Sequence, residues 1–383
     1  MRVLVLNVGS SSLKGSIVDS VDLVAIAKDE ISLGADATRQ KAIERTVDAL
    51  LAKLGVTSPH PALNRERGRG YPVEALGHRV VHGGTKFRSA VRVNDRVLKG
   101  IEALAEFAPL HNPVAAATIR AAQVALPKIP QVAAFDTAFH ATLSEEQYVY
   151  PVPWRWTREY GIRRFGFHGL SVEWSMRRAA ELLGRPAPEL GLVVAHLGSG
   201  CSVTAVLNGR SVATSMGLTP MEGLMMGTRA GSIDPGILLY MLRTRRTGWR
   251  ELETALDHQS GLVGVSGRAV GMRELERVAG EGNRRARLAI DMFVSRAAAG
   301  IAAAATALPR LDALVFTGGI GEHSGSVRSA IVRRLAALGL PSLPASDVRN
   351  DAVISPSGSA VAVLRVEARE DAVIARQAAE LLY

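Results

Sequence analysis

Cysteine and long apolar runs are scarce in this sequence, and each scarcity excludes a class of protein. The 383 residues include a single cysteine, Cys201, so no disulfide can form within the chain. No apolar stretch is expected to reach membrane-spanning length, and the opening run from Arg2 to Val8 is too short for the core of a signal peptide. These features favour a protein of the reducing cytoplasm with no membrane partner.

Zinc-ligand spacings, lysine-rich tails and basic strands interleaved with aromatic residues are also absent, although the chain is basic. Its 46 Lys and Arg against 36 Asp and Glu give a formal charge of +10. Such a charge can indicate nucleic-acid binding. The arginines are dispersed, however, with denser clusters only at 65–69 and 243–246. We therefore expect no nucleic-acid partner, and a protein that handles anionic, phosphorylated substrates explains the charge better.

The hydrophobic pattern predicts an α/β fold. Short runs rich in Val, Leu and Ile alternate with longer amphipathic or alanine-rich stretches. Asn208-Gly209 follows one of these runs and is a strong signal for a two-residue hairpin. We expect strands at 2–8, 13–18, 192–197, 201–207 and 313–317, and helices at 41–54, 114–126, 286–308, from about 324, and at 370–382.

A weak internal repeat divides the chain. Residues 4–12 can be laid over 193–201, with Gly9 on Gly198 and Ser10 on Ser199. The repeat predicts two related halves that face a shared cleft. At 383 residues the chain is long enough for two domains. We predict an N-terminal lobe at 1–138, joined by a C-terminal helix at 372–383, and a C-terminal lobe for nucleotide binding and dimerisation at 139–371.

Three glycine-rich turns, at 7–14, 196–200 and 318–322, could bind phosphate. Such turns supply backbone N–H groups from one direction, and two of these add hydroxyl groups. None has the spacing of a P-loop or a dinucleotide-binding motif. Any one of them alone is compatible with a plain hairpin or strand–helix turn, but three together favour a nucleotide cleft. Lys14 adds an ammonium that could meet a transferred phosphoryl group.

These turns are part of a resemblance to the acetate kinase family, within the superfamily of sugar kinases, Hsp70 and actin. It runs almost end to end, through eleven blocks in the family's order. Besides the three turns, the blocks are residues 77–84, 108–113, 135–140, 165–169, 215–223, 226–235, 260–267 and 370–376. The resemblance implies two actin-like (ribonuclease H-like) domains with mixed sheets flanked by helices and a cleft between them.

The implied activity is reversible, Mg²⁺-dependent transfer of the γ-phosphoryl group of ATP to acetate. It gives acetyl phosphate and ADP by direct in-line displacement, with Mn²⁺ as a possible substitute for Mg²⁺. The resemblance also implies a homodimer formed through the second domain.

The resemblance assigns the chemistry to a few residues. Arg79 would hold the carboxylate and Arg229 would contact carboxylate and phosphoryl group, because a planar guanidinium binds both bidentately. His168 would donate a hydrogen bond to the transition state, with His111 in support. The resemblance implies that Asp136 is the catalytic acidic residue. A carboxylate substrate is already deprotonated at pH 7, so we interpret Asp136 as orienting an arginine or the metal shell. Each of these residues taken alone is also compatible with a purely structural role.

The resemblance further implies an acyl pocket, a nucleotide site and a metal site. The residues of the acyl pocket would be Val81, Leu110, Phe167 and Pro220. One methylene changes binding by only about 1–3 kcal/mol, so acetate is the first choice and a propionate or butyrate kinase is the alternative. Nucleotide binding is implied for Ser10, Ser12, Lys14, His196, Leu197, Gly198, Ser199, Gly200, Arg273, Gly319, Ile320, Gly321, Glu322 and His323. The implied metal residues are Asn7 and Glu370, although Glu370 could simply favour the dipole of its helix.

Several positions depart from the family's pattern. Ser199 stands where asparagine is usual, Gly271 where aspartate is usual, and His323 where asparagine is usual. A second histidine usual after His168 is missing, with Val172 nearby. Since most departures lie on the nucleotide side, GTP and pyrophosphate stay open as alternative phosphoryl donors. A regulatory protein that binds nucleotide without transfer is the competing hypothesis from another class.

Overall fold

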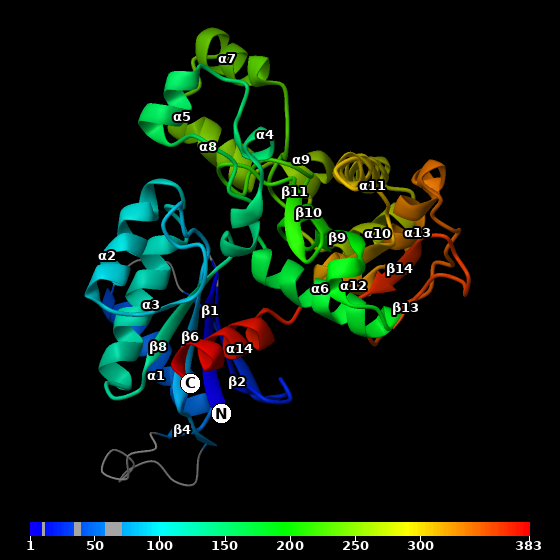
Figure 1. Cartoon of the computed structure of the whole chain (residues 1–383). Coiled ribbons are helices and arrows are strands. Elements are labelled where there is room, and N and C mark those ends of the chain that lie inside the picture. The colour runs from blue at the N-terminus through cyan, green and yellow to red at the C-terminus, as the bar shows by residue number, and fades with distance from the viewer. Residues whose placement is uncertain (10–11, 34–39, 58–70) are drawn as a thin grey trace. The chain divides into compact units, whose positions relative to one another are not determined.

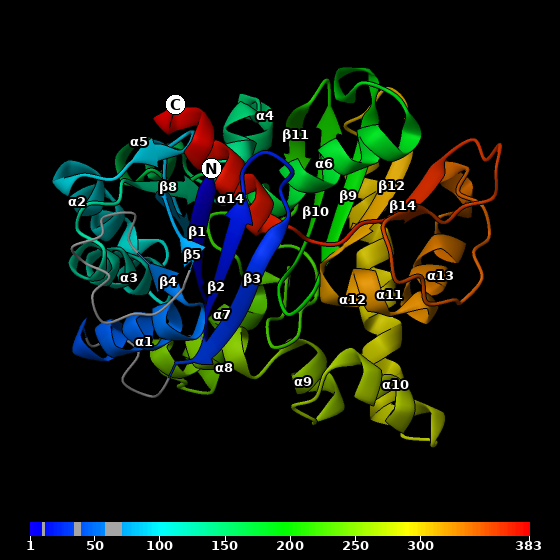
Figure 2. The same ribbon diagram turned by 90° about the horizontal axis from the view of Figure 1, so that it is seen from below.

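The structure, a computed structural model, describes residues 1–9, 12–33, 40–57 and 71–383. The chain divides into two compact units (Figures 1 and 2). Unit 1 comprises Met1–Ala141 and Arg369–Tyr383, and unit 2 comprises Thr142–Ala368. Both chain termini therefore belong to unit 1. Ser10, one of the predicted nucleotide-binding residues, lies outside the described residues.

Unit 1 is built on a mixed six-stranded sheet. Its strand order is β3-β2-β1-β6-β8-β7, in which β1, β6 and β8 are mutually parallel and the other pairings are antiparallel. The strands are β1 (Arg2–Val8), β2 (Ser12–Asp19), β3 (Ala25–Ser32), β6 (Ala75–Val80), β7 (Val91–Arg92) and β8 (Gln131–Phe135); β4 (Val56–Thr57) and β5 (Tyr71–Pro72) form a separate pair.

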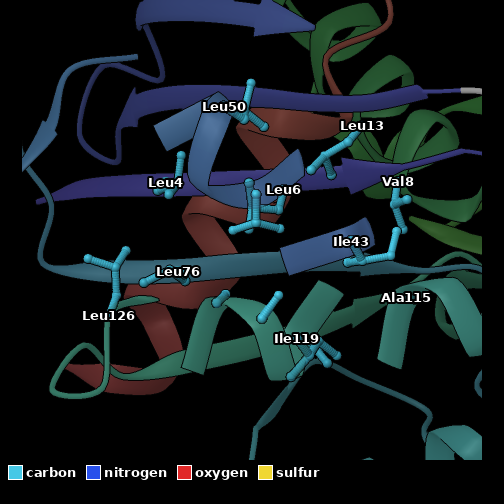
Figure 3. Close-up of a cluster of buried hydrophobic side chains, with 14 of the residues drawn as sticks. Leu4, Leu6, Val8, Leu13, Ile43, Leu50, Leu76, Ala115, Ile119 and Leu126 are labelled. Carbon is cyan, nitrogen blue, oxygen red and sulfur yellow. The ribbon is translucent and has the colours of Figure 1, made fainter. Parts of the chain in front are cut away.

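Alternate side chains along β1 and β6 point to opposite faces of this sheet. Leu4, Leu6 and Leu76 pack in one buried cluster with side chains of α1 (Gln40–Lys53) and α3 (Asn112–Ala125), as Figure 3 shows. Gly77 points the other way, onto α14 (Glu370–Leu382), where an added Cβ would lie 2.4 Å from Ile374 Cγ2. Asn7 and Arg79 share the alternation of Gly77 and therefore lie on the α14 face. Unit 1 also contains α2 (Asp95–Ala103) and a 3₁₀ helix at Leu104–Glu106.

Unit 2 repeats the sheet of unit 1. Its order is β11-β10-β9-β12-β14-β13, with the same sequence of parallel and antiparallel pairings. The repeat seen in the sequence places Val8 of β1 on Leu197 of β9, and both residues end the corresponding strands. The predicted fold class, two related actin-like α/β domains, is confirmed. The strands are β9 (Gly191–Leu197), β10 (Cys201–Leu207), β11 (Arg210–Thr214), β12 (Ala313–Thr317), β13 (Ala352–Val353) and β14 (Ala362–Arg365).

The predicted hairpin at residues 208–209 is present. Asn208 and Gly209 join β10 to β11 with φ of 52° and 75°. Positive φ at both central residues is the geometry that an Asn-Gly pair favours, because glycine has no Cβ and asparagine tolerates the left-handed region.

The helices of unit 2 are mostly short, and the first three precede its first strand. They are α4 (Glu145–Tyr148), α5 (Trp154–Tyr160), α6 (Gly169–Leu183), α7 (Pro235–Thr244), α8 (Trp249–His258), α9 (Gly261–Ser266), α10 (Met272–Gly280), α11 (Arg284–Ala305), α12 (Gly318–His323) and α13 (Gly325–Arg334). Further 3₁₀ helices lie at Ala187–Glu189 and Ala336–Leu338, and one at Ala138–Thr142 spans the point where the chain passes from unit 1 to unit 2.

The glycine turn predicted at 318–322 is instead a helix, α12. Three glycines in six residues disfavour a helix, so the surroundings must supply the stability. Buried Arg328 donates from Nη1 to the carbonyl oxygens of Gly321 and Glu322, at 2.8 and 2.9 Å. These bonds satisfy carbonyl groups at the helix end that the short helix leaves without partners.

Helix α11 corrects the expectation that no apolar stretch reaches membrane-spanning length. By length and composition its 22 residues could span a membrane. However, α11 packs against β9 and β10 and against α9, α10 and α13. Its buried residues include Ala289, Phe293 and Ala297. This packing is that of a helix in the core of a domain, where small side chains allow close approach.

Candidate active site

The carboxyl ends of the parallel strands of unit 1 bring three predicted residues together. Asn7 lies near the end of β1, Arg79 near the end of β6, and Asp136 directly after β8. These strands are neighbours in the sheet, and this edge is where ligands bind in α/β sheets. Glu370 joins them from the first turn of α14. The ends of β6 and β8 and the start of α14 thus bring one cation, Arg79, together with two carboxylates, Asp136 and Glu370.

Arg79 is the centre of this cluster. Its Nε lies 3.0 and 3.2 Å from Asp136 Oδ1 and Oδ2, and its Nη2 lies 2.6 Å from Oδ2. Its Nη1 donates to Asn7 Oδ1 at 3.1 Å. Asn7 Nδ2 in turn donates to Glu370 Oε2 at 3.0 Å, and Glu370 Oε2 lies 3.5 Å from Arg79 Nε. Asp136 therefore orients Arg79, which is one of the roles predicted for it.

The electrostatics of the cluster favour a bound cation. Burial alone would lower the pKa of Arg79, but Asp136 and then Glu370 outweigh it and hold the pKa above its ordinary value. One fixed positive charge faces two carboxylates, so the group carries an excess of negative charge.

Glu370 Oε1 is the acceptor best placed for such a cation. It makes no hydrogen bond to any residue that the structure describes. The described ranges hold no group of three or more His, Cys, Asp or Glu that could bind a metal ion by itself. A Mg²⁺ ion fits this donor set, because it usually takes one or two carboxylates and keeps phosphate and water as its other ligands.

The unit 1 residues predicted for the acyl pocket are held by a second hydrogen-bond link. The Asn112 side chain accepts from His82 N at 3.1 Å and donates to His82 O at 3.0 Å. It thus joins the segment after β6, which contains Val81, to the turn that contains Leu110 and His111. Val81 is buried and Leu110 is 43% exposed.

Lys14 is the partner of Asn7 across the β1–β2 ladder, so the two side chains share the α14 face of the sheet. Its Nζ lies 3.8 Å from Glu30 Oε2, and the side chain is exposed. Ser12 is the first residue of β2. The strand ends that flank the predicted phosphate-binding turn of unit 1 thus lie beside the Arg79 cluster.

Two stacked histidines mark the corresponding edge of unit 2. The rings of His168 and His196 have centroids 4.2 Å apart. His168 Nδ1 lies 3.0 Å from the Ser202 hydroxyl, and His196 Nδ1 lies 2.8 Å from the Ser171 hydroxyl. Each serine fixes the orientation of its ring.

Gly200 leaves room for the close approach of His168. A Cβ at this position would lie 3.2 Å from His168 Nε2. Nε2 is therefore the ring atom that faces the glycine turn, while Nδ1 faces Ser202. A hydroxyl that donates to Nδ1 leaves the proton on Nε2, which is then a hydrogen-bond donor.

A cavity of about 830 Å³ lies in unit 2. This volume is in the range of sites for small molecules and cofactors. Six predicted nucleotide-binding residues line the cavity: Gly198, Ser199, Arg273, Gly319, Ile320 and His323. Gly271, one of the departures from the family's pattern, also lines it, and so do Thr228 and Glu276.

Other predicted nucleotide-binding residues do not line this cavity. Glu322 turns its carboxylate away: Oε1 accepts from Ala368 N at 2.9 Å, and Oε2 lies 3.6 Å from Arg365 Nη2. Arg365 is the last residue of β14, and Ala368 lies in the segment that follows it. The other predicted nucleotide-binding residues of unit 2 that do not line the cavity are His196, Leu197, Gly200 and Gly321.

The residues 215–223, here called the acyl-pocket loop, are tied to the segment that contains Phe167. Phe165 N donates to Gly217 O at 3.0 Å, and Arg164 Nη1 donates to the carbonyls of Ser215 and Met216, both at 3.0 Å. Phe167 is buried, and Pro220 lies within the loop.

Three side chains that the sequence did not point to clamp this loop. Glu222 accepts from Arg164 Nη2 at 2.8 Å and from the Tyr150 hydroxyl, and that hydroxyl accepts from Leu218 N at 3.0 Å. Burial raises the pKa of Tyr150, so the hydroxyl stays protonated and can donate to Glu222. In the sequence, Arg164 directly precedes the block at 165–169 and Glu222 lies within the block at 215–223, but no pattern indicated that they pair.

Arg229 lies in the segment between the acyl-pocket loop and α7. Its Nε donates to Asp257 Oδ1, a second contact that the motifs did not indicate. Thr228, its neighbour, lines the 830 Å³ cavity. The structure thus places Arg229 next to a wall of the cavity within unit 2.

Comparison with known proteins gives one consistent result. Residues 2–376 match the Acetokinase family. An acetate kinase of Deinococcus radiodurans is 46% identical over 399 aligned positions, which cover 100% of this chain and 98% of that protein.

Solved structures agree with the sequence match. A propionate kinase from Francisella tularensis aligns with a TM-score of 0.87 at 34% identity, and an acetate kinase of Porphyromonas gingivalis with 0.86 at 32%. Each alignment covers 100% of both chains.

Proposed function

This chain belongs to the acetokinase family, and from that premise we propose that it is an acetate kinase. The reaction is reversible transfer of the γ-phosphoryl group of ATP to acetate, which gives acetyl phosphate and ADP. One observation carries the proposal: the full-length match to acetate kinases includes the positions of the Asn7–Arg79–Asp136–Glu370 cluster, whose carboxylates suit a metal ion and whose arginine can meet an anion.

The chemistry is a direct displacement. An acetate oxygen attacks the γ-phosphorus, the bond from that phosphorus to the β–γ bridging oxygen breaks, and ADP leaves with the electron pair. No proton has to be removed from acetate at pH 7, so no general base is needed. Catalysis then depends on neutralising charge and holding the reactants in line.

Arg79 supplies the fixed positive charge for the carboxylate. Asp136 occupies its Nε and Nη2 donors and keeps the guanidinium in place. Asp136 therefore acts on the reaction through Arg79. The residues proposed for the acyl methyl group are Val81 and Leu110 in unit 1 and Phe167 and Pro220 in unit 2.

His168 and Arg229 are the residues of unit 2 assigned to the transferring phosphoryl group. His168 would donate from Nε2, with Ser202 fixing the ring. His111 of unit 1 is the residue proposed to support them in the transfer. The nucleotide would occupy the 830 Å³ cavity, with the glycines and hydroxyls of its lining next to the phosphates.

Mg²⁺ is the proposed metal, with Mn²⁺ as a substitute, and Glu370 is the residue that would hold it through Oε1. Asn7 would orient Glu370, because its own amide oxygen is already occupied by Arg79. When bound, the metal would neutralise charge on the phosphate oxygens.

We further propose a cytoplasmic homodimer that binds neither nucleic acid nor membrane. Large apolar side chains are exposed on α5, α7 and α8 of unit 2, among them Trp154 (58%), Leu239 (64%) and Trp249 (64%). Exposed apolar groups of this size favour a protein partner, here a second copy of the chain. In this proposal the N-terminal lobe is 1–138 with the C-terminal helix, and the lobe at 139–371 forms the dimer.

Trapping the product with hydroxylamine tests the proposal. Acetyl hydroxamate should form only when acetate, Mg²⁺ and nucleotide are all present. Comparing kcat/KM for acetate, propionate and butyrate identifies the preferred acceptor. Comparing kcat/KM for ATP, GTP and pyrophosphate identifies the preferred phosphoryl donor. Nucleotide binding without turnover in every combination would refute the proposal in favour of a regulatory protein.

A further inference from the structure

Asp257 is a buried carboxylate that has no part in the reaction described so far. It lies near the end of α8, and its side chain is 9% exposed. Its Oδ1 accepts a hydrogen bond from Nε of Arg229, and its Oδ2 lies 3.7 Å from Nε2 of exposed His258. A buried carboxylate is costly without a charged partner, and Arg229 is the partner that compensates it.

The backbone around Arg229 is fixed to the same corner of the fold. Thr228 Oγ1 donates to Asp257 O at 2.7 Å, and Ser260 N donates to Thr228 O at 2.8 Å. Ala230 N donates to Leu256 O at 3.3 Å. Both residues next to Arg229 in the chain, Thr228 and Ala230, are therefore hydrogen-bonded to the end of α8 or the start of α9.

The Asp257 contact leaves the two Nη groups of Arg229 available to bind another group. Within the described part of the chain, Nε is the one guanidinium nitrogen of Arg229 with a hydrogen bond to another residue, and Nη1 and Nη2 have no such partner. Arg79 differs, because Asp136 and Asn7 engage all three of its nitrogens. Two adjacent Nη groups are the donors with which an arginine binds an anion bidentately.

We propose that Asp257 is a positioning residue, which holds Arg229 by Nε and presents its two Nη groups to the reacting anion. This inference rests on the proposed function. An unanchored arginine must lose the freedom of a long side chain when it binds, and the Asp257 contact removes much of that freedom beforehand. Thr228 links this anchor to the wall of the nucleotide cavity.

The first experiment measures steady-state kinetics of Asp257→Asn and Asp257→Ala with acetate and Mg-ATP. Asparagine keeps an acceptor oxygen without the charge, so kcat should fall about tenfold. Alanine removes the anchor, so kcat should fall about 100-fold, which is the effect expected when a catalytic group is misplaced. The nucleotide KM should stay within about twofold, because the backbone bonds that shape the cavity wall remain. Glu253→Gln, an exposed carboxylate on the same helix, is the matched control and should match wild type.

A double-mutant comparison separates positioning from a purely structural role. In an Arg229→Ala background, Asp257→Asn should cause no further loss of kcat, because the residue through which it acts is gone. An equal loss in both backgrounds, a wild-type kcat in Asp257→Ala, or a loss of nucleotide affinity that accounts for the whole effect would each overturn the proposal.

Binding of inorganic phosphate tests the anchor without turnover. Calorimetry should show weaker binding for Asp257→Ala and for Arg229→Ala than for wild type. If the wild type fails to turn over any acid, the proposed function fails, while weaker phosphate binding by Asp257→Ala still supports the positioning role. Equal phosphate binding by wild type and Asp257→Ala would overturn that role.

Discussion

His78, the neighbour of Arg79 on β6, makes unit 1 sensitive to acid. It points to the opposite face of the sheet, where its Nε2 lies 2.8 Å from Gln131 Oε1. Its Nδ1 is buried and has no hydrogen-bond partner in the described structure. Burial lowers the pKa of His78 to about 4, and the contact with Gln131 offsets only part of this shift. Protonation would put an uncompensated charge beneath the strand that holds Arg79.

The loss of stability in acid depends on the difference between the pKa of His78 in the folded and in the unfolded protein. The pKa is lower in the folded state than the ordinary 6.5, so the stability from this group is full above about pH 6.5 and is lost as pH falls towards 4. Linkage gives a loss of about 2 kcal/mol at pH 5 and about 3 kcal/mol at pH 4. These are large fractions of the free energy of unfolding of a typical domain.

Urea unfolding of wild type and His78→Gln at several pH values measures this loss. Circular dichroism reports both units, whereas tryptophan fluorescence reports unit 2 alone, since all four tryptophans lie between residues 154 and 249. Between pH 7.5 and 5 the free energy of unfolding of unit 1 should fall by about 2 kcal/mol more in wild type than in the variant. His323→Gln, which removes an exposed imidazole, should behave as wild type. Equal pH dependence in wild type and His78→Gln would refute the reasoning.

Three further substitutions have defined outcomes. Asp136→Asn leaves Arg79 buried with one compensating charge fewer, so both the thermal midpoint and kcat should fall, the latter at least 100-fold; a hydroxamate assay at the wild-type rate would contradict this. Gly200→Ala places a methyl group 3.2 Å from His168 Nε2, and kcat should fall about tenfold with little change in the KM for acetate. An unchanged kcat would contradict the claim that crowding of this ring disturbs catalysis. Tyr150→Phe removes the hydroxyl that ties the acyl-pocket loop, so the preference for acetate over propionate in kcat/KM should fall about fivefold; an unchanged ratio would separate the clamp from specificity.

The sequence predicted the framework of both units because the signals there are local and repeated. The β-strand pattern of residues 2–8 recurs at 191–197, and the structure places both runs at the same position in sheets of the same order. Helix α14 has the predicted bounds, Glu370–Leu382. Asp136 follows β8 as expected, because a polar residue after a fully buried run marks a strand end.

What the sequence could not predict depends on contacts between distant residues. Asp257 lies 28 residues from Arg229, outside every glycine-rich block, and no periodicity links the two. Glu322 belongs to a glycine-rich block, yet its carboxylate binds Ala368 N, 46 positions away. Helix α12 was predicted as a turn because the arginine that satisfies its carbonyls, Arg328, follows it in the chain and is buried only in the folded state.

The central claim is that guanidinium groups neutralise the two reacting anions. The most direct test is the rate of acetyl phosphate formation by Arg229→Ala, compared with wild type and Arg229→Lys at saturating Mg-ATP. Loss of a group that stabilises transition-state charge predicts a fall of about 10²–10³ in kcat for alanine, a smaller fall for lysine, and a retained fold by circular dichroism. Arg229→Ala that forms acetyl phosphate at the wild-type rate would contradict the claim.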